Sequence, residues 1–378
     1  MSELKQRIAG MSIDRRALLE QRLLQARRLQ RTQPTIPQRQ STDATWLSFG
    51  QQQMWFLDQL TPGTSTYNIP DAMQISGPLD VSALERALQV IVGRHEVLRT
   101  HLASVDGSPV PVAEEHWSIK VSVIDVRSSS QEDRAAEAKK IILQEARKPF
   151  DISQDLMLRA VVVRLQENEH LLLFLTHHIA WDVSSRVVLY RELATLYEGF
   201  VTGPPVQLPQ LPIQYSDYAA WQRQRLQGEV FEQQAAYWRE QLGNAARVLN
   251  LPTDRPRPPV QSFHGAKHFF TFSKCLTESA RQMSREQNAT LFMTLAASFV
   301  TFLYGLTGQT DISLGSPMVG RNYPELEGLI GVYLSSSAAP VSFQIPQFCS
   351  SAVPQSRNSA VRQSFHSGHH GSHEQQPL

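Results

Sequence analysis

The sequence predicts an α+β protein built from two lobes. Short apolar runs with strand character alternate along the chain with longer segments whose apolar residues recur at helical spacing. Proline-rich passages at residues 203–212 and 252–259 interrupt this alternation. Mixed strand and helix content on both sides of such a crossing segment is typical of two separately packed lobes.

An N-terminal lobe is expected between residues 46 and 205. Its most regular part is a pair of apolar runs on either side of a polar turn, which predicts a β-hairpin. Around it, apolar residues recur with a period close to 3.6, which predicts amphipathic helices. The expected elements are helices over 81–92 and 132–147, strands over 161–165 and 171–175, and a helix from Ser184 through Tyr197.

A partial C-terminal lobe is expected between residues 206 and 341. The same criteria of period and length predict a long helix, two shorter helices and two short strands. These are a helix over 217–242, a strand over 267–272, helices over 278–287 and 290–306, and a strand over 311–314.

The two ends of the chain differ in composition from both lobes. Residues 1–45 predict an amphipathic leader helix over 14–30, capped by Asp14, and then a polar linker. Residues 342–378 are dominated by Ser, Gln, Pro and His, without periodicity, which predicts a disordered tail. The histidines of this tail have no rigid scaffold or thiolate partners, so we expect no dedicated metal site there.

Composition excludes several classes of function. The 36 basic and 35 acidic residues leave almost no net charge, which argues against nucleic acid as the main partner. No apolar stretch is long enough to predict a membrane span, and the first residues lack a secretory signal. Two cysteines, Cys275 and Cys349, provide neither a disulfide framework nor metal-ligand spacing. We therefore expect a cytoplasmic protein.

The candidate catalytic residues lie at the end of the second hairpin strand. The apolar run 169–175 leads into His177, His178 and, four residues later, Asp182, where the next helix is expected to begin. An imidazole at a strand-to-helix junction is well placed to face a cleft and to exchange protons near neutral pH. The alternative is a hydrogen-bonded core histidine beside an aspartate that only caps the helix. For these residues in isolation, the two interpretations are evenly balanced.

Other segments, taken in order, identify a family. The histidine pattern followed by Asp182 resembles the core motif of the condensation domains of nonribosomal peptide synthetases, and further motifs of that family have counterparts on both sides of it. The resemblance runs from about residue 15 to 335. The segments that carry it are residues 48–60, 94–100, 149–159, 177–182, 215–222, 237–258 and 315–333.

The resemblance implies a fold and a reaction. The fold would be two lobes like those of chloramphenicol acetyltransferase, meeting at a V-shaped cleft with His178 near its floor. The reaction would be amide formation, in which the amine of an acceptor aminoacyl thioester attacks a donor acyl or peptidyl thioester. Both substrates would be carried on the phosphopantetheine arms of upstream and downstream peptidyl carrier proteins, with an adenylation domain as a further partner. The domain itself would bind no metal or other cofactor.

The same resemblance suggests a role for each residue of the motif. His178 would contact the attacking amine, either as general base or as a positioning group, and His177 would support the loop. Asp182 would be structural rather than catalytic, because a buried carboxylate needs a charge partner, for which Arg321 is the candidate. Arg94 and Arg99, with Glu96, would form a salt-bridged network that supports the cleft, or else a solvated helix end.

Three departures from the family pattern stand out. Val183 replaces the glycine that follows the motif aspartate, and a β-branched residue at positive φ would cost about 1–3 kcal/mol or shift the loop. Gln53 stands where the first motif usually has arginine. Motifs expected after the fifth are absent, so the second lobe is expected to be truncated, and a frameshift near Leu334 would explain this.

Three alternatives to a condensation domain remain open at this stage. An epimerisation domain shares the histidine element but fits residues 94–100 and 251–258 less well. An ester-forming acyltransferase of the same superfamily stays a minor alternative, because the motif does not encode the acceptor nucleophile. An inactive fragment that binds carrier proteins would need only a folded first lobe.

Overall fold

The protein is described by a computed structural model, in two compact units. The first unit combines Met1–Arg239 with Gly315–Ala339, and the second combines Glu240–Leu314 with Pro340–Leu378. The expected leader helix and most of the expected tail lie outside the described residues. The structure describes residues 35–40, 45–203, 206–243, 248–259, 265–266, 268–316 and 320–333, and the backbone of 340–344.

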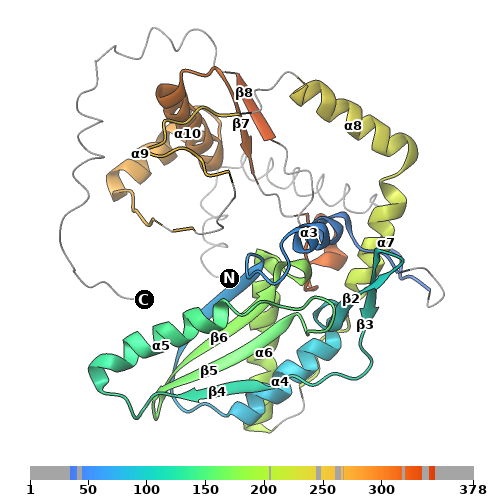
Figure 1. Ribbon diagram of the computed structural model, residues 1–378, viewed down its shortest axis with the longest axis vertical. Helices are drawn as coiled ribbons and strands as arrows, with labels where there is room; N and C mark the ends of the chain where they lie inside the picture. The colour runs from blue at the N-terminus through green and yellow to red at the C-terminus, as the bar shows by residue number, and fades with distance from the viewer. Residues whose placement is uncertain are drawn as a thin grey trace, which may run out of the picture. The chain divides into compact units, whose positions relative to one another are not determined.

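A four-stranded sheet organises the first unit (Figure 1). Its strand order is β1-β6-β5-β4, in which β6 pairs antiparallel with β1 and β5, and β4 runs parallel to β5. The central pair is the hairpin expected from the two apolar runs. The strands are β1 (Asn68–Ser76), β4 (Val121–Asp125), β5 (Leu158–Gln166) and β6 (Glu169–His177).

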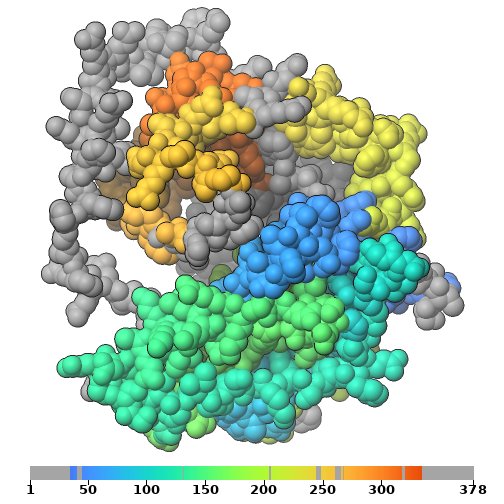
Figure 2. All heavy atoms as spheres, viewed as in Figure 1, coloured from blue at the N-terminus to red at the C-terminus, as the bar shows by residue number. Residues whose placement is uncertain are grey.

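Helices cover both faces of this sheet. On one face, Val162 and Phe174 share a core with α4 (Val81–Arg94) and α6 (Val183–Thr202). On the other face, alternate residues of β5 and β6 pack against α5 (Gln131–Ala146), which lies across the sheet in Figure 1 and at the surface in Figure 2. Because both faces are buried, the central strands consist of continuous apolar runs instead of alternating ones.

Shorter elements surround the end of the sheet at which β6 finishes. The β2–β3 hairpin turns at Asp106 and Gly107, whose φ angles are 50° and 76°, as a tight Asp-Gly turn requires. These elements are α3 (Phe49–Leu60), η1 (Glu96–Arg99), β2 (Thr100–Val105), β3 (Ser108–Ala113), η2 (His178–Ala180) and α7 (Tyr215–Arg225).

The long helix expected over 217–242 is wrong, because the structure divides it into α7 and α8 (Gly228–Leu242). The helical path ends at Leu226, whose ψ is 61°, and α8 begins at Gly228 with a left-handed φ of 58°. Tyr215 and Tyr218 of α7 belong to the core of the first unit. The first unit therefore extends past residue 205, where the sequence suggested a boundary between lobes.

The second unit contains α9 (Lys274–Glu286), α10 (Leu291–Thr307) and a pair of strands, β7 (Asp311–Gly315) and β8 (Pro340–Gln344). The strand expected over 267–272 is wrong, because its described residues are irregular and Phe269 and Phe270 are 86% and 71% exposed. The expected tail also begins too early, since residues 342–344 belong to β8. Val341 and Phe343 favour a strand, but only pairing with the distant β7 could reveal it.

Within the described ranges, no single helix is long and apolar enough to cross a bilayer. The helices Lys274–Glu286 and Leu291–Thr307 reach the length and apolar composition of a membrane span only when they are taken together, and the pair is bent by 106°.

Candidate active site

The motif residues lie on a short turn that joins β6 to α6. Strand β6 ends at His177, η2 covers His178–Ala180, and Asp182 is the N-cap residue of α6. The backbone N–H of His178 donates to the carbonyl of Tyr67 at 2.9 Å, which fixes the start of the turn against the chain that enters β1. All of these residues belong to the first unit.

His178 has one ring nitrogen engaged and one uncommitted. Its Nδ1 lies 2.7 Å from the carbonyl oxygen of Trp181. A carbonyl oxygen can only accept a hydrogen bond, so in the neutral ring Nδ1 carries the proton and Nε2 the lone pair. The side chain is half-buried, and no hydrogen bond from the described residues reaches Nε2. The turn thus presents a basic nitrogen in a fixed tautomer.

His177 lies inside the protein and has a different environment. Its side chain is buried between the rings of Tyr67 and Phe150, with centroid distances of 6.1 and 5.9 Å. Burial, together with the neighbouring His178, lowers the pKa of His177 to about 4. Its Nδ1 accepts a hydrogen bond from the backbone N–H of Ile179 at 3.2 Å. His177 is therefore a neutral residue that holds the turn from within.

Asp182 and Arg321 form a buried ion pair. Arg321 Nη2 lies 2.9 Å from Asp182 Oδ1, and the two side chains are 6% and 7% exposed. The same carboxylate accepts hydrogen bonds from the backbone N–H and the hydroxyl of Ser185, at 2.7 and 2.8 Å. Because its charge is compensated and its oxygens are occupied, this carboxylate is suited to a structural role.

Arg321 and Asp182 also fix a distant segment against the turn. Arg321 donates to the backbone carbonyls of Leu326 and Leu329, and the N–H of Tyr333 donates to Asp182 Oδ2 at 3.4 Å. The guanidinium lies 4.2 Å from the centroid of the Tyr333 ring. Residues 320–333 are thereby part of the support of the turn, although they are far from it in sequence.

Arg94 and its neighbour His95 belong to a second buried polar cluster. Arg94 Nε and His95 Nε2 contact the two carboxylate oxygens of Glu192, at 3.0 and 2.9 Å. His95 Nδ1 accepts a hydrogen bond from the backbone N–H of Ile330. Burial lowers the pKa of His95 in spite of the carboxylate beside it. The family motif predicted a supporting role for Arg94, but nothing in the sequence pattern predicted that His95 and Glu192 would be its partners.

The expected network of Arg94, Glu96 and Arg99 is not formed. Glu96 pairs with Arg39 at 3.4 Å, and Arg99 lies over the ring of Trp117 at 4.6 Å while donating to a backbone carbonyl. Arg94 is the last residue of α4, whereas Glu96 and Arg99 lie on η1, and each of the three side chains has a different partner. Arg94 therefore belongs to a cluster with Glu192, whereas Arg99 supports the β2–β3 region.

Val183 does not cause the strain that its sequence position suggested. It is the first residue of α6, and it is absent from the described non-glycine residues with positive φ, which are Asp106 and Asn288. Its side chain is 79% exposed. A β-branched residue fits the helical backbone found here, so the positive φ on which the strain of about 1–3 kcal/mol depended is not present.

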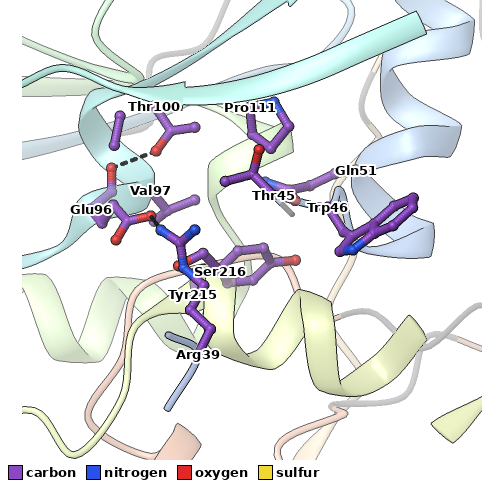
Figure 3. A pocket seen from close by; sticks show the side chains of 11 residues that line it. Arg39, Thr45, Trp46, Gln51, Glu96, Val97, Thr100, Pro111, Tyr215 and Ser216 are labelled. Carbon is purple, nitrogen blue, oxygen red and sulfur yellow. Dashed lines mark hydrogen bonds and ion pairs between the residues drawn. The ribbon is translucent and has the colours of Figure 1, made fainter. Parts of the chain in front are cut away.

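One contact with the turn escaped the sequence analysis. Gln51 of α3 is buried, and its side-chain amide donates to the carbonyl of Ile179 at 3.2 Å. The available signal was the capping-box pattern of Ser48 and Gln51, which predicts the start of a helix and nothing about a distant turn. Figure 3 shows Gln51 beside a small cavity whose lining also includes Tyr215 and the Arg39–Glu96 pair.

The described residues do not include a candidate metal site. Within the described ranges, no group of three or more His, Cys, Asp or Glu side chains is arranged to hold an ion. Cys275, the cysteine within those ranges, is exposed and unpaired.

Comparison with known proteins gives a consistent family. A family model described as "Condensation domain" matches residues 41–368. One of the linear gramicidin synthase proteins of Brevibacillus parabrevis is 47% identical over 292 residues, which is 77% of this chain and 4% of that protein. Phosphinothricin tripeptide synthetase PhsC of Streptomyces viridochromogenes is 36% identical over 345 residues, which is 91% of this chain and 32% of that protein. The chain thus spans a small part of these relatives.

Solved structures agree with this result at the level of the fold. The first condensation domain of the CDA synthetase has a TM-score of 0.62 and 22% identity, covering 78% of this chain and 69% of that one. The X-domain solved with OxyB from teicoplanin biosynthesis has a TM-score of 0.71 and 24% identity, with coverages of 80% and 66%. These likenesses confirm the α+β fold expected from the motifs.

Proposed function

This chain belongs to the condensation domain family, and on that premise we propose that it forms amide bonds between thioester substrates. The acceptor amine attacks the carbonyl carbon of the donor thioester, so that a C–N bond forms and the C–S bond breaks. The amine loses a proton, and the departing thiolate gains one. The observation that carries the proposal is the uncommitted Nε2 of His178, which holds the lone pair in the neutral tautomer that the bond between Nδ1 and Trp181 selects.

His178 Nε2 would accept a hydrogen bond, and then the proton, from the attacking amine. A positioned base of this kind typically contributes about 10²–10⁴-fold to the rate. The pKa of His177 is too low for it to exchange a proton near neutral pH, and Asp182 is committed to Arg321. His178 is therefore the candidate catalytic residue, and the other two motif residues hold the turn.

The substrates of such a reaction come to the site on partner domains. We expect the donor and acceptor to be bound to phosphopantetheine arms of an upstream and a downstream peptidyl carrier protein, with an adenylation domain loading the acceptor carrier. The reaction needs no further cofactor, because the thioester is already an activated acyl group. We expect it to take place in the cytoplasm, where such carriers are charged.

The test uses short thioesters in place of loaded carriers. The purified chain is incubated with a panel of N-acetyl-aminoacyl pantetheine donors and of aminoacyl or hydroxyacyl pantetheine acceptors, and the condensed product is measured by mass spectrometry. Binding of an acyl-loaded carrier protein is measured in parallel. His178→Ala should lower the rate by about 10²–10⁴-fold. His116→Ala, at an exposed histidine, is the matched control.

Three results would contradict the proposal. Unchanged turnover in His178→Ala would remove the residue from the reaction. Product formed only with hydroxyacyl pantetheine acceptors would indicate an ester-forming enzyme. Binding of an acyl-loaded carrier protein without turnover on any member of the panel would indicate a carrier-binding domain.

A further inference from the structure

We propose that Gln51 is a positioning residue for His178, acting through the backbone of the turn that carries it. This inference deepens the proposed function and rests on it. Its basis is the contact between the buried amide of Gln51 and the carbonyl of Ile179, the residue that follows His178. Gln51 lies on α3, more than a hundred residues away in sequence.

The amide of Gln51 can have only one orientation. Its Oε1 accepts a hydrogen bond from the backbone N–H of Ser48 at 3.2 Å, so its NH₂ group must be the end that faces Ile179. The backbone N–H of Gln51 in turn donates to Ser48 Oγ at 3.1 Å. The side chain is 4% exposed, and its donor and acceptor ends are both bonded. Such a group holds its partner carbonyl in a defined place.

The chain of hydrogen bonds continues from Ser48 into the core. Ser48 Oγ lies 2.8 Å from the hydroxyl of Tyr215, and that hydroxyl donates to the carbonyl of Val332 at 2.7 Å. Since a carbonyl only accepts, the proton of Tyr215 is committed to Val332, and Ser48 must donate to Tyr215. Burial raises the pKa of Tyr215 well above its ordinary value, so this hydroxyl stays protonated as the chain requires.

Both ends of the turn are thereby connected to one segment. Ile179 is joined to Val332 through Gln51, Ser48 and Tyr215, whereas Asp182 accepts directly from the N–H of Tyr333. His178 directly precedes Ile179, and its own backbone N–H donates to the carbonyl of Tyr67 on the other side. Its ring is bonded to the carbonyl of Trp181, which lies between Ile179 and Asp182. A backbone that is fixed on both sides of the imidazole leaves the ring little freedom to move.

The consequence for catalysis is a defined position for Nε2. The Nδ1 of His178 is bonded within the same turn, so a displacement of the turn carries the whole ring with it. A misplacement of about 1 Å in a reacting group can cost about 10²-fold in rate. We expect loss of the Gln51 contact to lower kcat by about 10–100-fold, with little change in KM for either thioester.

Two substitutions distinguish the effect of the Gln51 hydrogen-bond donor from the effect of the side chain's volume and length. Gln51→Leu keeps most of the volume and removes the donor. Gln51→Glu keeps the length and the acceptor for Ser48, but sets a carboxylate oxygen against the carbonyl of Ile179. Burial raises the pKa of a carboxyl group, and its neutral form can donate as the amide does. The ratio of Gln51→Glu activity to wild-type activity should therefore rise as the pH falls.

Gln53→Glu is the matched control. It introduces the same change on the same helix, at an exposed side chain for which the described residues provide no hydrogen bond. We expect its kcat to stay within twofold of wild type at every pH.

A second readout does not depend on turnover. In protein labelled with [¹⁵N]histidine, long-range ¹H–¹⁵N spectra identify which ring nitrogen of His178 carries the proton, and His178→Ala assigns the signal. The wild type should show the Nδ1–H tautomer, and Gln51→Leu a mixture of tautomers. A residue that contributed only to stability would leave this signal unchanged in the folded protein.

The outcomes are distinct. The proposal is supported by a lower kcat, the tautomer change and the recovery of Gln51→Glu at low pH. It is overturned if both Gln51 variants keep kcat within twofold and the His178 signal does not change. If His178→Ala keeps full activity, the proposed function fails, whereas the spectra still show whether Gln51 holds the ring. Should Gln51→Leu fail to fold, Ser48→Ala removes the next bond of the chain and must give the same tautomer mixture.

Discussion

Replacing Arg321 by methionine tests how much of the site depends on one buried ion pair. The substitution leaves the Asp182 carboxylate, 7% exposed, without its cation, and it also removes the donor to the carbonyls of Leu326 and Leu329. Breaking one side of a buried pair typically costs about 3–5 kcal/mol, because the remaining charge stays in the interior. Two hydrogen bonds from Ser185 remain on the carboxylate, which favours the lower half of that range.

The free energy of unfolding is measured in urea by tryptophan fluorescence. Lys148→Met is the control, since Lys148 pairs with Glu145 at the surface with its side chain 60% exposed, and such pairs contribute about 0–1 kcal/mol. The double variant Asp182→Asn with Arg321→Met should recover part of the loss, because no charge then remains unpaired.

A loss of less than about 1 kcal/mol in Arg321→Met would refute the argument that burial makes this pair costly to break. A double variant as unstable as the sum of the two single ones would refute the coupling between the partners.

Two further predictions concern the neighbours of this pair. Val183→Gly should lower the free energy of unfolding by up to about 1 kcal/mol, because Val183 occupies an unstrained helical position where glycine is less favourable, and a gain in stability would show that strain is present after all. The pKa of His177, about 4 in the folded protein, lies below its unfolded value of about 6.5, so the unfolded state takes up a proton first as the pH falls. Stability should therefore decrease from pH 6.5 towards pH 4, by an amount on the order of 3 kcal/mol, and then level off. The pH dependence of urea unfolding measures this, and a slope that persists unchanged in His177→Asn would assign it to other groups.

The sequence predicted the elements whose pattern is local. The hairpin of β5 and β6, helices α4 to α6 and the turn at His178 follow from apolar periods and from one motif, because each is determined by residues close in the chain. The contact of Asp182 with Arg321 was anticipated by a different argument, namely that a buried carboxylate needs a cation. That argument does not depend on how far apart the two residues are in the sequence. It does need a family motif to limit which arginine or lysine can be the partner.

Features that depend on distant neighbours were not accessible in this way. The break at Gly228 depends on a left-handed φ that a single glycine permits but does not require. Strand β8 exists through its pairing with β7, across the intervening residues 316–339. The bond from Gln51 to Ile179 joins a helix start to a turn that nothing in the local pattern connects. In each case the required residue type can be recognised in the sequence, but the local pattern does not show which distant residue is its partner.

Several buried polar residues of the first unit lie close to the turn that carries His178. Ser48, Gln51, Asp182, Ser185 and Glu192 are each at most 6% exposed, and each has its hydrogen bonds to charged, polar or backbone groups. Buried polar networks stabilise a fold only when their members are satisfied, and they then make it rigid. Two polar atoms in this region have no partner among the described residues: Nε2 of the half-buried His178 and the hydroxyl of the fully buried Tyr333. Of these two atoms only Nε2 is a base that the interior does not enclose. A largely bonded, rigid surround with such a nitrogen would suit the proposed reaction, whose chemistry is mainly alignment and the transfer of one proton.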